Sequence, residues 1–193
     1  MDLLLAYLQQ YISLNQEEIA FLQQNLTIKE HPKNELLFQE GNISRTIYFV
    51  SKGLVRLFYT VDGLEKTAFF YTAGKFICAG ESFTYAIPAK ENYQTIETAT
   101  IIHLDKNNIE KLLIQLPQLE IIGRMAVEEE LITAQKIIAS FVTKSPTERY
   151  LELLDQQGEL FQRAPQQYIA SYLGVSPETL SRIKKRITPN RPS

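Results

Sequence analysis

The chain has 193 residues, of which 45% are hydrophobic and 22% charged, as is ordinary for a globular protein of one large or two small domains. A single cysteine, Cys78, excludes an intramolecular disulfide, an iron–sulfur cluster and a zinc site built on several thiolates. The two histidines, His31 and His103, have no metal-ligand spacing, so we expect no metal site. The net charge of −2 is unevenly distributed, because the residues from position 176 onwards carry +4 and the remainder −6, which suits a polyanion-binding end on an acidic body. The bases of that segment are Arg182, Lys184, Lys185, Arg186 and Arg191, against one acid, Glu178.

Residues 1–30 are predicted to be helical and to begin without a targeting signal. Apolar residues at helical spacing, among them Leu4, Leu8 and Ile12, indicate a first helix, and Ser13 or Asn15 can cap a second one. The chain start has no basic segment and no small-residue cleavage site, and no apolar run approaches the roughly 20 residues that span a bilayer. We therefore expect a soluble, cytoplasmic protein with no membrane partner.

The region 35–105 is predicted to form a small β-barrel or sandwich. Short runs rich in β-branched and aromatic residues alternate there with turn signals. The pair Asp62-Gly63 separates two such runs and is a strong hairpin signal, because both turn positions tolerate a positive φ. The expected strands are 36–38, 46–50, 54–61 and 65–71, with closing strands within 95–104.

A long helix is expected after Pro117, which can occupy its first turn, and no further proline occurs before Pro146. Within this helix, apolar residues at alternating steps of four and three form a seam that lets two helices interdigitate. The seam predicts a dimer interface of Val127, Leu131, Ala134 and Ile138, continued by Phe141 or Val142. The alternative is one amphipathic helix buried on its own domain. A hinge at 143–146, a helix over 147–155 and a looser stretch to 165 are expected next.

The segment from position 165 begins with a short helix that ends at a glycine. Tyr168, Ile169 and Leu173 give this helix an apolar face, and Ala170 is small where a second helix would cross it. Gly174 follows at a sharp turn, which suits glycine because it accepts a positive φ. The pattern predicts the first helix and the turn of a helix-turn-helix.

The second helix is expected to start at Pro177, with Ser176 as its N-cap. Leu180 and Ile183 form its buried edge, which leaves a polar and cationic outer face of Glu178, Thr179, Ser181, Arg182 and Lys185. Such a helix fits the major groove of DNA. The alternative is a structural helical hairpin with a solvated face.

The outer face offers groups that can read bases and bind phosphates. Arg182 can donate two hydrogen bonds to guanine, and Glu178 can accept one from cytosine. The remaining cations can neutralise phosphates; they are Lys184, Lys185 and Arg186.

At these residues the chain resembles the cyclic-AMP receptor protein/fumarate–nitrate regulator (Crp/Fnr) superfamily. The DNA-binding signature corresponds to 169–183, Ile-Ala-Ser-Tyr-Leu-Gly-Val-Ser-Pro-Glu-Thr-Leu-Ser-Arg-Ile. The N-terminal part is similar to the β-roll of that family at Gly41, Tyr48-Phe49-Val50, Lys52-Gly53, Val55-Arg56 and Asp62-Gly63. The resemblance spans nearly the whole chain.

The resemblance implies an α+β fold in three parts. These are an N-terminal double-stranded β-helix or jelly roll of the cyclic-nucleotide-binding type (1–115), a long dimerisation helix (116–143) and a C-terminal winged helix-turn-helix (144–193). It further implies a homodimer on a near-palindromic operator in double-stranded DNA, with Glu178 and Arg182 reading bases. Thr179, Ser181 and Lys185 would approach the DNA backbone. The family often has a cation at the place of Pro177, so one base contact is missing here and the preferred operator should differ.

The family's cyclic-nucleotide site combines a Gly-Glu pair with an arginine and a small hydroxyl residue further along the chain. Gly80, Glu81 and Ser82 match the first half, but Glu91 or Asn92, followed by Tyr93, stands where the arginine belongs. Without a guanidinium a cyclic phosphate loses its bidentate, charge-assisted partner. We therefore expect no cofactor and no cyclic AMP binding, and either another small-molecule effector or none. A sensor role for Cys78 competes with its being a buried small hydrophobe.

The sequence predicts a bacterial, sequence-specific DNA-binding transcription regulator, with RNA polymerase as a further partner. The alternative is a small-molecule or cyclic-nucleotide-binding module that acts through protein partners, and the cationic outer face of the second helix argues against it. An enzyme is not expected, because no catalytic triad, metal constellation or phosphate-cradling loop is recognisable.

Overall fold

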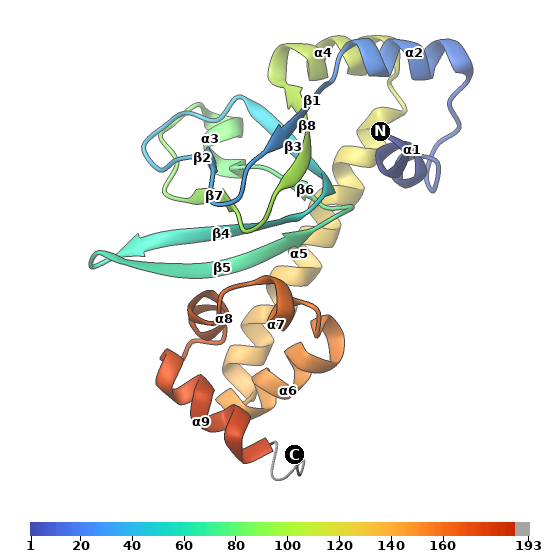
Figure 1. Cartoon of the computed structure of the whole chain (residues 1–193). Helices are drawn as coiled ribbons and strands as arrows, with labels where there is room; N and C mark the ends of the chain where they lie inside the picture. The colour runs from blue at the N-terminus through green and yellow to red at the C-terminus, as the bar shows by residue number, and fades with distance from the viewer. Residues whose placement is uncertain (188–193) are drawn as a thin grey trace. The chain divides into compact units, whose positions relative to one another are not determined.

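The computed structural model describes residues 1–187, which form two compact units. The N-terminal unit contains Met1–Leu57 and Phe70–Leu131, and the C-terminal unit contains Phe58–Phe69 together with the chain from Ile132 onwards (Figure 1). The sequence did not indicate that residues 58–69 belong with the C-terminal helices. The division at 1–115, 116–143 and 144–193 stays a prediction, and Arg191 lies outside the described residues.

Two short helices open the chain, α1 (Asp2–Leu8) and α2 (Gln16–Gln24). Asn15 caps α2: its side chain accepts the Glu18 N–H at 2.9 Å, and the Glu18 carboxylate accepts the Asn15 N–H at 2.8 Å. The prediction of helix through residue 30 is wrong at its end, where Thr27–His31 form strand β1. The reason is long-range, because all five residues of β1 pair antiparallel with β8 (Ala99–Asp105).

Two four-stranded sheets form the β structure, with the strand orders β1-β8-β3-β6 and β2-β7-β4-β5. This confirms the predicted cyclic-nucleotide-binding-like jelly roll. The strand β6 and the short helix α3 were not expected from the sequence, since both are too short to show a period. The remaining bounds are β2 Leu36–Phe38, β3 Thr46–Lys52, β4 Leu54–Val61, β5 Leu64–Thr72, β6 Phe76–Ile77, α3 Gly80–Tyr85 and β7 Asn92–Thr95.

Apolar side chains from the strands and helices pack the core of the N-terminal unit. Phe49 and Ile102 are fully buried and belong to one cluster with Leu4 of α1, Leu112 of α4 (Lys106–Gln115) and Ile122 of α5. Burial of a side chain of this size contributes about 1.5–3 kcal/mol each. This cluster therefore packs the sheet β1-β8-β3-β6 against the flanking helices.

The long helix α5 spans Leu119–Thr143 and begins two residues after Pro117. Three consecutive acids lie in α5 at positions 128–130, and two of them accept hydrogen bonds from tyrosines of the N-terminal unit. Glu129 accepts a hydrogen bond from the Tyr7 hydroxyl at 3.1 Å, and Glu130 accepts one from the Tyr71 hydroxyl at 2.8 Å. Burial raises the pKa of Glu130 above its usual range.

Within the described residues 1–187, the predicted seam of α5 is not covered by the rest of the chain. Val127, Leu131 and Ile138 are 67%, 55% and 63% exposed, and Ala134 is half-buried. The alternative of a seam buried on its own domain is therefore wrong for these three residues. No helix of the described residues is long and apolar enough to cross a membrane.

In the described part of the C-terminal unit four further helices follow: α6 (Pro146–Gln157), α7 (Leu160–Arg163), α8 (Gln166–Tyr172) and α9 (Pro177–Ile187). Ser145 caps α6 through a reciprocal pair of hydrogen bonds with Glu148, so the predicted hinge contains a helix start. The part of 144–193 that the structure describes contains no strand, so the wing is not formed there. The stretch expected to be loose instead carries α7, because Leu160 is fully buried and anchors one helical turn.

Candidate nucleic-acid interface

The helices α8 and α9 form the helix-turn-helix that the sequence pattern indicates. Ala170 and Leu180 are fully buried, and Ile169, Leu173 and Ile183 are each at most 7% exposed. These side chains are apolar and come from both helices, so α8 and α9 share one small core.

The turn between the two helices is held in place by Gly174 and Arg149. Gly174 has a φ of +69°, and a Cβ at this position would lie 2.6 Å from the Phe141 ring. The Arg149 guanidinium donates to the Leu173 carbonyl through Nε (3.2 Å) and Nη2 (3.0 Å), and to the Lys144 carbonyl through Nη1 (2.8 Å). It also lies over the Phe141 ring, 4.5 Å from the centroid. One arginine thus ties the turn to the end of α5.

A polar network orders the start of α9. The Ser176 hydroxyl oxygen accepts the Thr179 N–H at 3.2 Å, as an N-cap does. The Thr179 hydroxyl oxygen in turn accepts a hydrogen bond from Nη2 of Arg182 at 3.0 Å. Hydrogen bonds from Ser176 and from its own backbone lower the pKa of Glu178, which favours the carboxylate as an acceptor. The network therefore presents a cation and an acceptor side by side.

The residues predicted to contact DNA do not all share one surface. Ser176, Pro177, Glu178, Arg182, Lys185 and Arg186 are exposed, and Thr179 and Ser181 are half-buried. Lys184 lies against the protein instead of on the outer face, because its ammonium is 5.5 Å from the centroid of the Phe161 ring of α7. A cation in that position covers an aromatic face, a contact worth about 0.5–1 kcal/mol at exposed sites.

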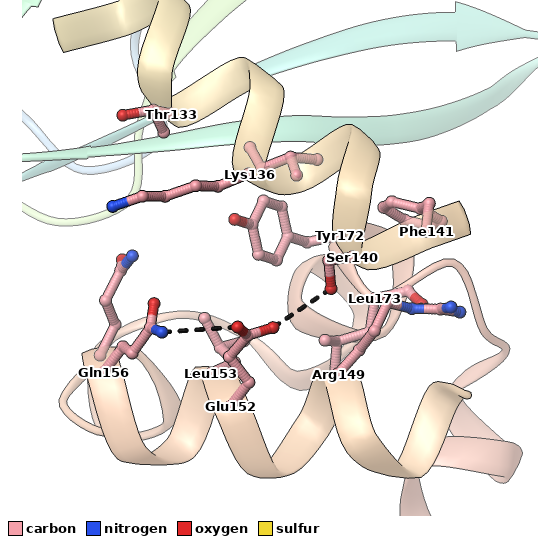
Figure 2. Close-up of a pocket in the computed structure, with 12 residues that line it drawn as sticks. Thr133, Lys136, Ser140, Phe141, Arg149, Glu152, Leu153, Gln156, Tyr172 and Leu173 are labelled. Atoms are coloured by element: carbon pink, nitrogen blue, oxygen red, sulfur yellow. Dashed lines mark hydrogen bonds between the residues drawn. The ribbon is translucent and has the colours of Figure 1, made fainter. Parts of the chain in front are cut away.

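Behind the helix-turn-helix, a cleft of about 190 Å³ lies between α5, α6 and α8 (Figure 2). Glu152 is its central acceptor, with hydrogen bonds from Ser140 Oγ at 3.2 Å and Lys144 Nζ at 2.5 Å. Burial, and then the nearby Glu152 carboxylate, raise the pKa of Tyr172. The hydrogen bonds to Glu152 thus link the end of α5 to α6. No sequence pattern indicates this cleft, because its residues come from three separate helices.

The residues predicted for an effector pocket bond to the protein itself. Ser82 is buried, accepts the Ser44 N–H at 2.8 Å and donates to the Ile87 carbonyl at 2.6 Å. Asn92 accepts the Glu40 N–H at 3.0 Å, and the Tyr93 hydroxyl donates to the Cys78 carbonyl at 2.9 Å.

At the other predicted pocket positions, Gly80 opens α3, and the exposed Glu81 carboxylate lies 4.0 Å from Lys90 Nζ. Gly80 and Glu81 are exposed, whereas Ser82, Asn92 and Tyr93 are buried, and the effector pocket stays a prediction. Burial raises the pKa of the Cys78 thiol to about 12, which makes a thiolate at this site unfavourable.

Two histidines that are far apart in sequence meet in the N-terminal unit, which the sequence pattern did not indicate. The pairing of β1 with β8 brings His31 Nε2 within 3.0 Å of His103 Nε2, and the two rings stack. Burial and the proximity of His31 lower the pKa of His103 to about 4. Within the described residues, no group of three or more His, Cys, Asp or Glu side chains has the arrangement of a metal site.

Comparisons with known proteins agree with this architecture. The sequence model of the family "cyclic nucleotide-binding domain" matches residues 28–115. The chain is 26% identical to the transcriptional activator protein Anr of Pseudomonas protegens and 25% identical to the transcriptional activator protein FnrA of Stutzerimonas stutzeri, in both cases over 93% of this chain and 78% of the relative. The fold is similar to that of the c-di-GMP responsive global regulator CLP of Xanthomonas campestris, with a TM-score of 0.72 at 18% identity over 90% of this chain and 91% of that one.

A jelly roll of the cyclic-nucleotide-binding type, a long helix and a helix-turn-helix with an exposed cationic helix define a DNA-binding transcription regulator. The similarity to Anr and FnrA extends over nearly the whole chain. The chain is thus similar to Crp/Fnr-type transcription activators, and residues 28–115 match the cyclic nucleotide-binding domain.

Proposed function

We propose that this regulator binds a near-palindromic operator as a homodimer, with α9 of each subunit in the major groove. The observation that carries the proposal is the exposed outer face of α9, which places Glu178, Arg182 and Lys185 opposite the buried Leu180 and Ile183. Base-reading groups then lie in the first two turns and phosphate-binding cations toward the helix end, as major-groove recognition requires.

Within this face, Arg182 and Glu178 are the proposed base-reading residues. A guanidinium that donates two hydrogen bonds suits the N7 and O6 acceptors of guanine, and a carboxylate suits the amino group of cytosine. Pro177 has no side-chain donor or acceptor for a base. The base pair that faces Pro177 should therefore be recognised by fewer hydrogen bonds. Thr179, Ser181, Lys185 and Arg186 would contact the DNA backbone, and Ser176 would lie beside it. Lys184 would contribute through long-range charge, because its side chain lies against Phe161.

The proposed dimer interface is the seam of α5. Three of its four residues are large apolar side chains that water contacts in the single chain. Covering them with the same residues of a second copy removes that apolar area and places two α9 helices on one duplex. Anr and FnrA are transcriptional activators, which supports RNA polymerase as a further partner of this chain. A bacterial protein that binds genomic DNA is expected in the cytoplasm.

The jelly roll is proposed to act without cyclic AMP. Glu91 or Asn92 stands at the place of the phosphate-binding arginine, and the Asn92 side chain accepts a hydrogen bond from the backbone of Glu40. CLP, which has a similar fold, responds to c-di-GMP. The jelly roll of this chain is therefore proposed to bind a small molecule other than cyclic AMP, or to act without an effector. Titration calorimetry with cyclic AMP and cyclic GMP should give no saturable heat, and tight binding of either would contradict this part of the proposal.

The proposal is tested by selecting bound fragments from the protein's own genome. We expect enrichment of a two-fold symmetric motif whose half-sites are about one helical turn apart, 10–10.5 base pairs from centre to centre. Affinity for the motif should also fall steeply with salt, because cations on α9 release counterions from the duplex. Retention of all fragments alike would contradict sequence-specific binding.

A further inference from the structure

The strand β5 lies at the edge of its sheet, next to β4. Edge strands direct backbone N–H and C=O groups outward, and residues two apart, such as Glu65 and Thr67, direct theirs to the same side. In the C-terminal unit this side meets α8. The Thr67 N–H donates to Ser171 Oγ at 2.9 Å, and the Ser171 hydroxyl donates to the Glu65 carbonyl at 3.4 Å. One hydroxyl thus serves as acceptor and donor where a neighbouring strand would otherwise pair.

The same hairpin also borders the start of α9. A groove of about 640 Å³ is lined on one side by Gly63–Lys66 and on the other by residues of α8 and by Gly174–Pro177. The side chains proposed to read bases, Glu178 and Arg182, do not line this groove and are exposed. The hairpin therefore contacts α8 and borders the start of α9. The outer face of α9 that carries Glu178 and Arg182, called the reading face below, stays exposed.

We propose that Ser171 is a positioning residue for DNA binding. It docks α8 on the edge of β5, three residues before the turn at Gly174. Because α8 and α9 share a buried core through Ala170 and Leu180, the docking of α8 also fixes the direction in which α9 presents its reading face. The inference rests on the proposed function, in which α9 reads the operator.

The test compares Ser171→Ala with Ser171→Thr, which keeps the hydroxyl, and with Ser140→Ala as a matched control. Ser140 also donates one side-chain hydrogen bond in this unit, but its acceptor is Glu152 of α6 and not the hairpin. The first readout is amide hydrogen exchange at Thr67 in the full-length free protein. It should become faster in Ser171→Ala and stay unchanged in Ser171→Thr and Ser140→Ala.

The second readout is affinity for the selected operator and for a random duplex. Ser171→Ala should lose about fivefold to tenfold in operator affinity, the effect of one net hydrogen bond, and nothing on random DNA. Its salt dependence should equal that of the unmodified protein, because no charge changes. Ser171→Thr should restore operator affinity, and Ser140→Ala should leave it unchanged.

Three outcomes would overturn the inference. Unchanged exchange at Thr67 in Ser171→Ala would show that the contact is absent. Faster exchange with unchanged operator affinity would show that the contact supports only the fold. Tighter operator binding would show that the hairpin holds the helices away from DNA. If the unmodified protein discriminates between no duplexes, the proposed function fails, whereas the exchange at Thr67 still tests the contact.

Discussion

Replacing Gly174 with alanine should destabilise the C-terminal unit by about 1.5–3 kcal/mol. At a φ of +69° the backbone is in the left-handed region, where a residue with a Cβ costs about 1–2 kcal/mol. The new Cβ would lie 2.6 Å from Cε1 of Phe141, so the ring has to move. That ring also carries the Arg149 guanidinium at 4.5 Å, a contact worth about 0.5–1 kcal/mol that the movement disrupts.

Urea unfolding followed by circular dichroism measures this change. The matched control is Gly123→Ala in α5, where the φ is not positive and no atom lies within 4 Å of the added Cβ. Because alanine is the better helix former, this control should be stabilised by about 0.5–1 kcal/mol. In the background of Phe141→Ala the cost of Gly174→Ala should fall to its backbone part. A loss below about 0.5 kcal/mol, or equal effects at the two glycines, would refute the reasoning.

Other predictions concern the seam, the reading face and the histidine pair. Leu131→Glu places a charge on the exposed seam of α5 and should give monomers by light scattering with weaker operator binding, whereas a mutant that stays dimeric would show that another face pairs. Arg182→Ala should cost about 1–3 kcal/mol at the best operator and relax specificity at one base pair, and an equal loss on random DNA would argue against base reading. The pKa of His103 is about 4 in the folded protein against an ordinary value near 6.5, so the unfolded chain takes up a proton first as the pH falls through this window. Stability should therefore decline between pH 6.5 and 4 by more than in a His103→Gln variant, and identical urea midpoints in the two proteins at every pH would contradict this.

Local sequence signals predicted much of the fold. Asp62-Gly63 between two β-rich runs indicates the hairpin, and Asp62 and Gly63 do have a positive φ. The spacing of Ile169, Leu173, Leu180 and Ile183 indicates the buried face of the helix-turn-helix. In both cases the information lies within a few residues of chain.

The features that the sequence did not indicate depend on distant contacts. Strand β1 is set by its pairing with β8, more than sixty residues away, rather than by its own pattern. The same pairing brings His31 and His103 together. The docking of Ser171 on Thr67 joins positions 104 residues apart, and no periodicity in either segment points to it.

The exposure of the outer face of α9 could be predicted from local sequence, whereas the hydrogen bonds of the residues proposed for the effector site could not. The reading face of α9 follows from helical geometry alone, with the exception of Lys184, whose position depends on Phe161 of α7. The effector residues match a family pattern, but Ser82 and Asn92 bond to Ser44 and Glu40, which lie in other segments.

The central claim is that the outer face of α9 distinguishes one base sequence from another. The most direct measurement is the ratio of dissociation constants for a fragment recovered from the genome and for a shuffled duplex of identical composition, at an ionic strength of about 0.15 M. We predict that the recovered fragment binds at least about 10³-fold more tightly, and that Arg182→Ala lowers this ratio. Equal affinity for the two duplexes would contradict the account.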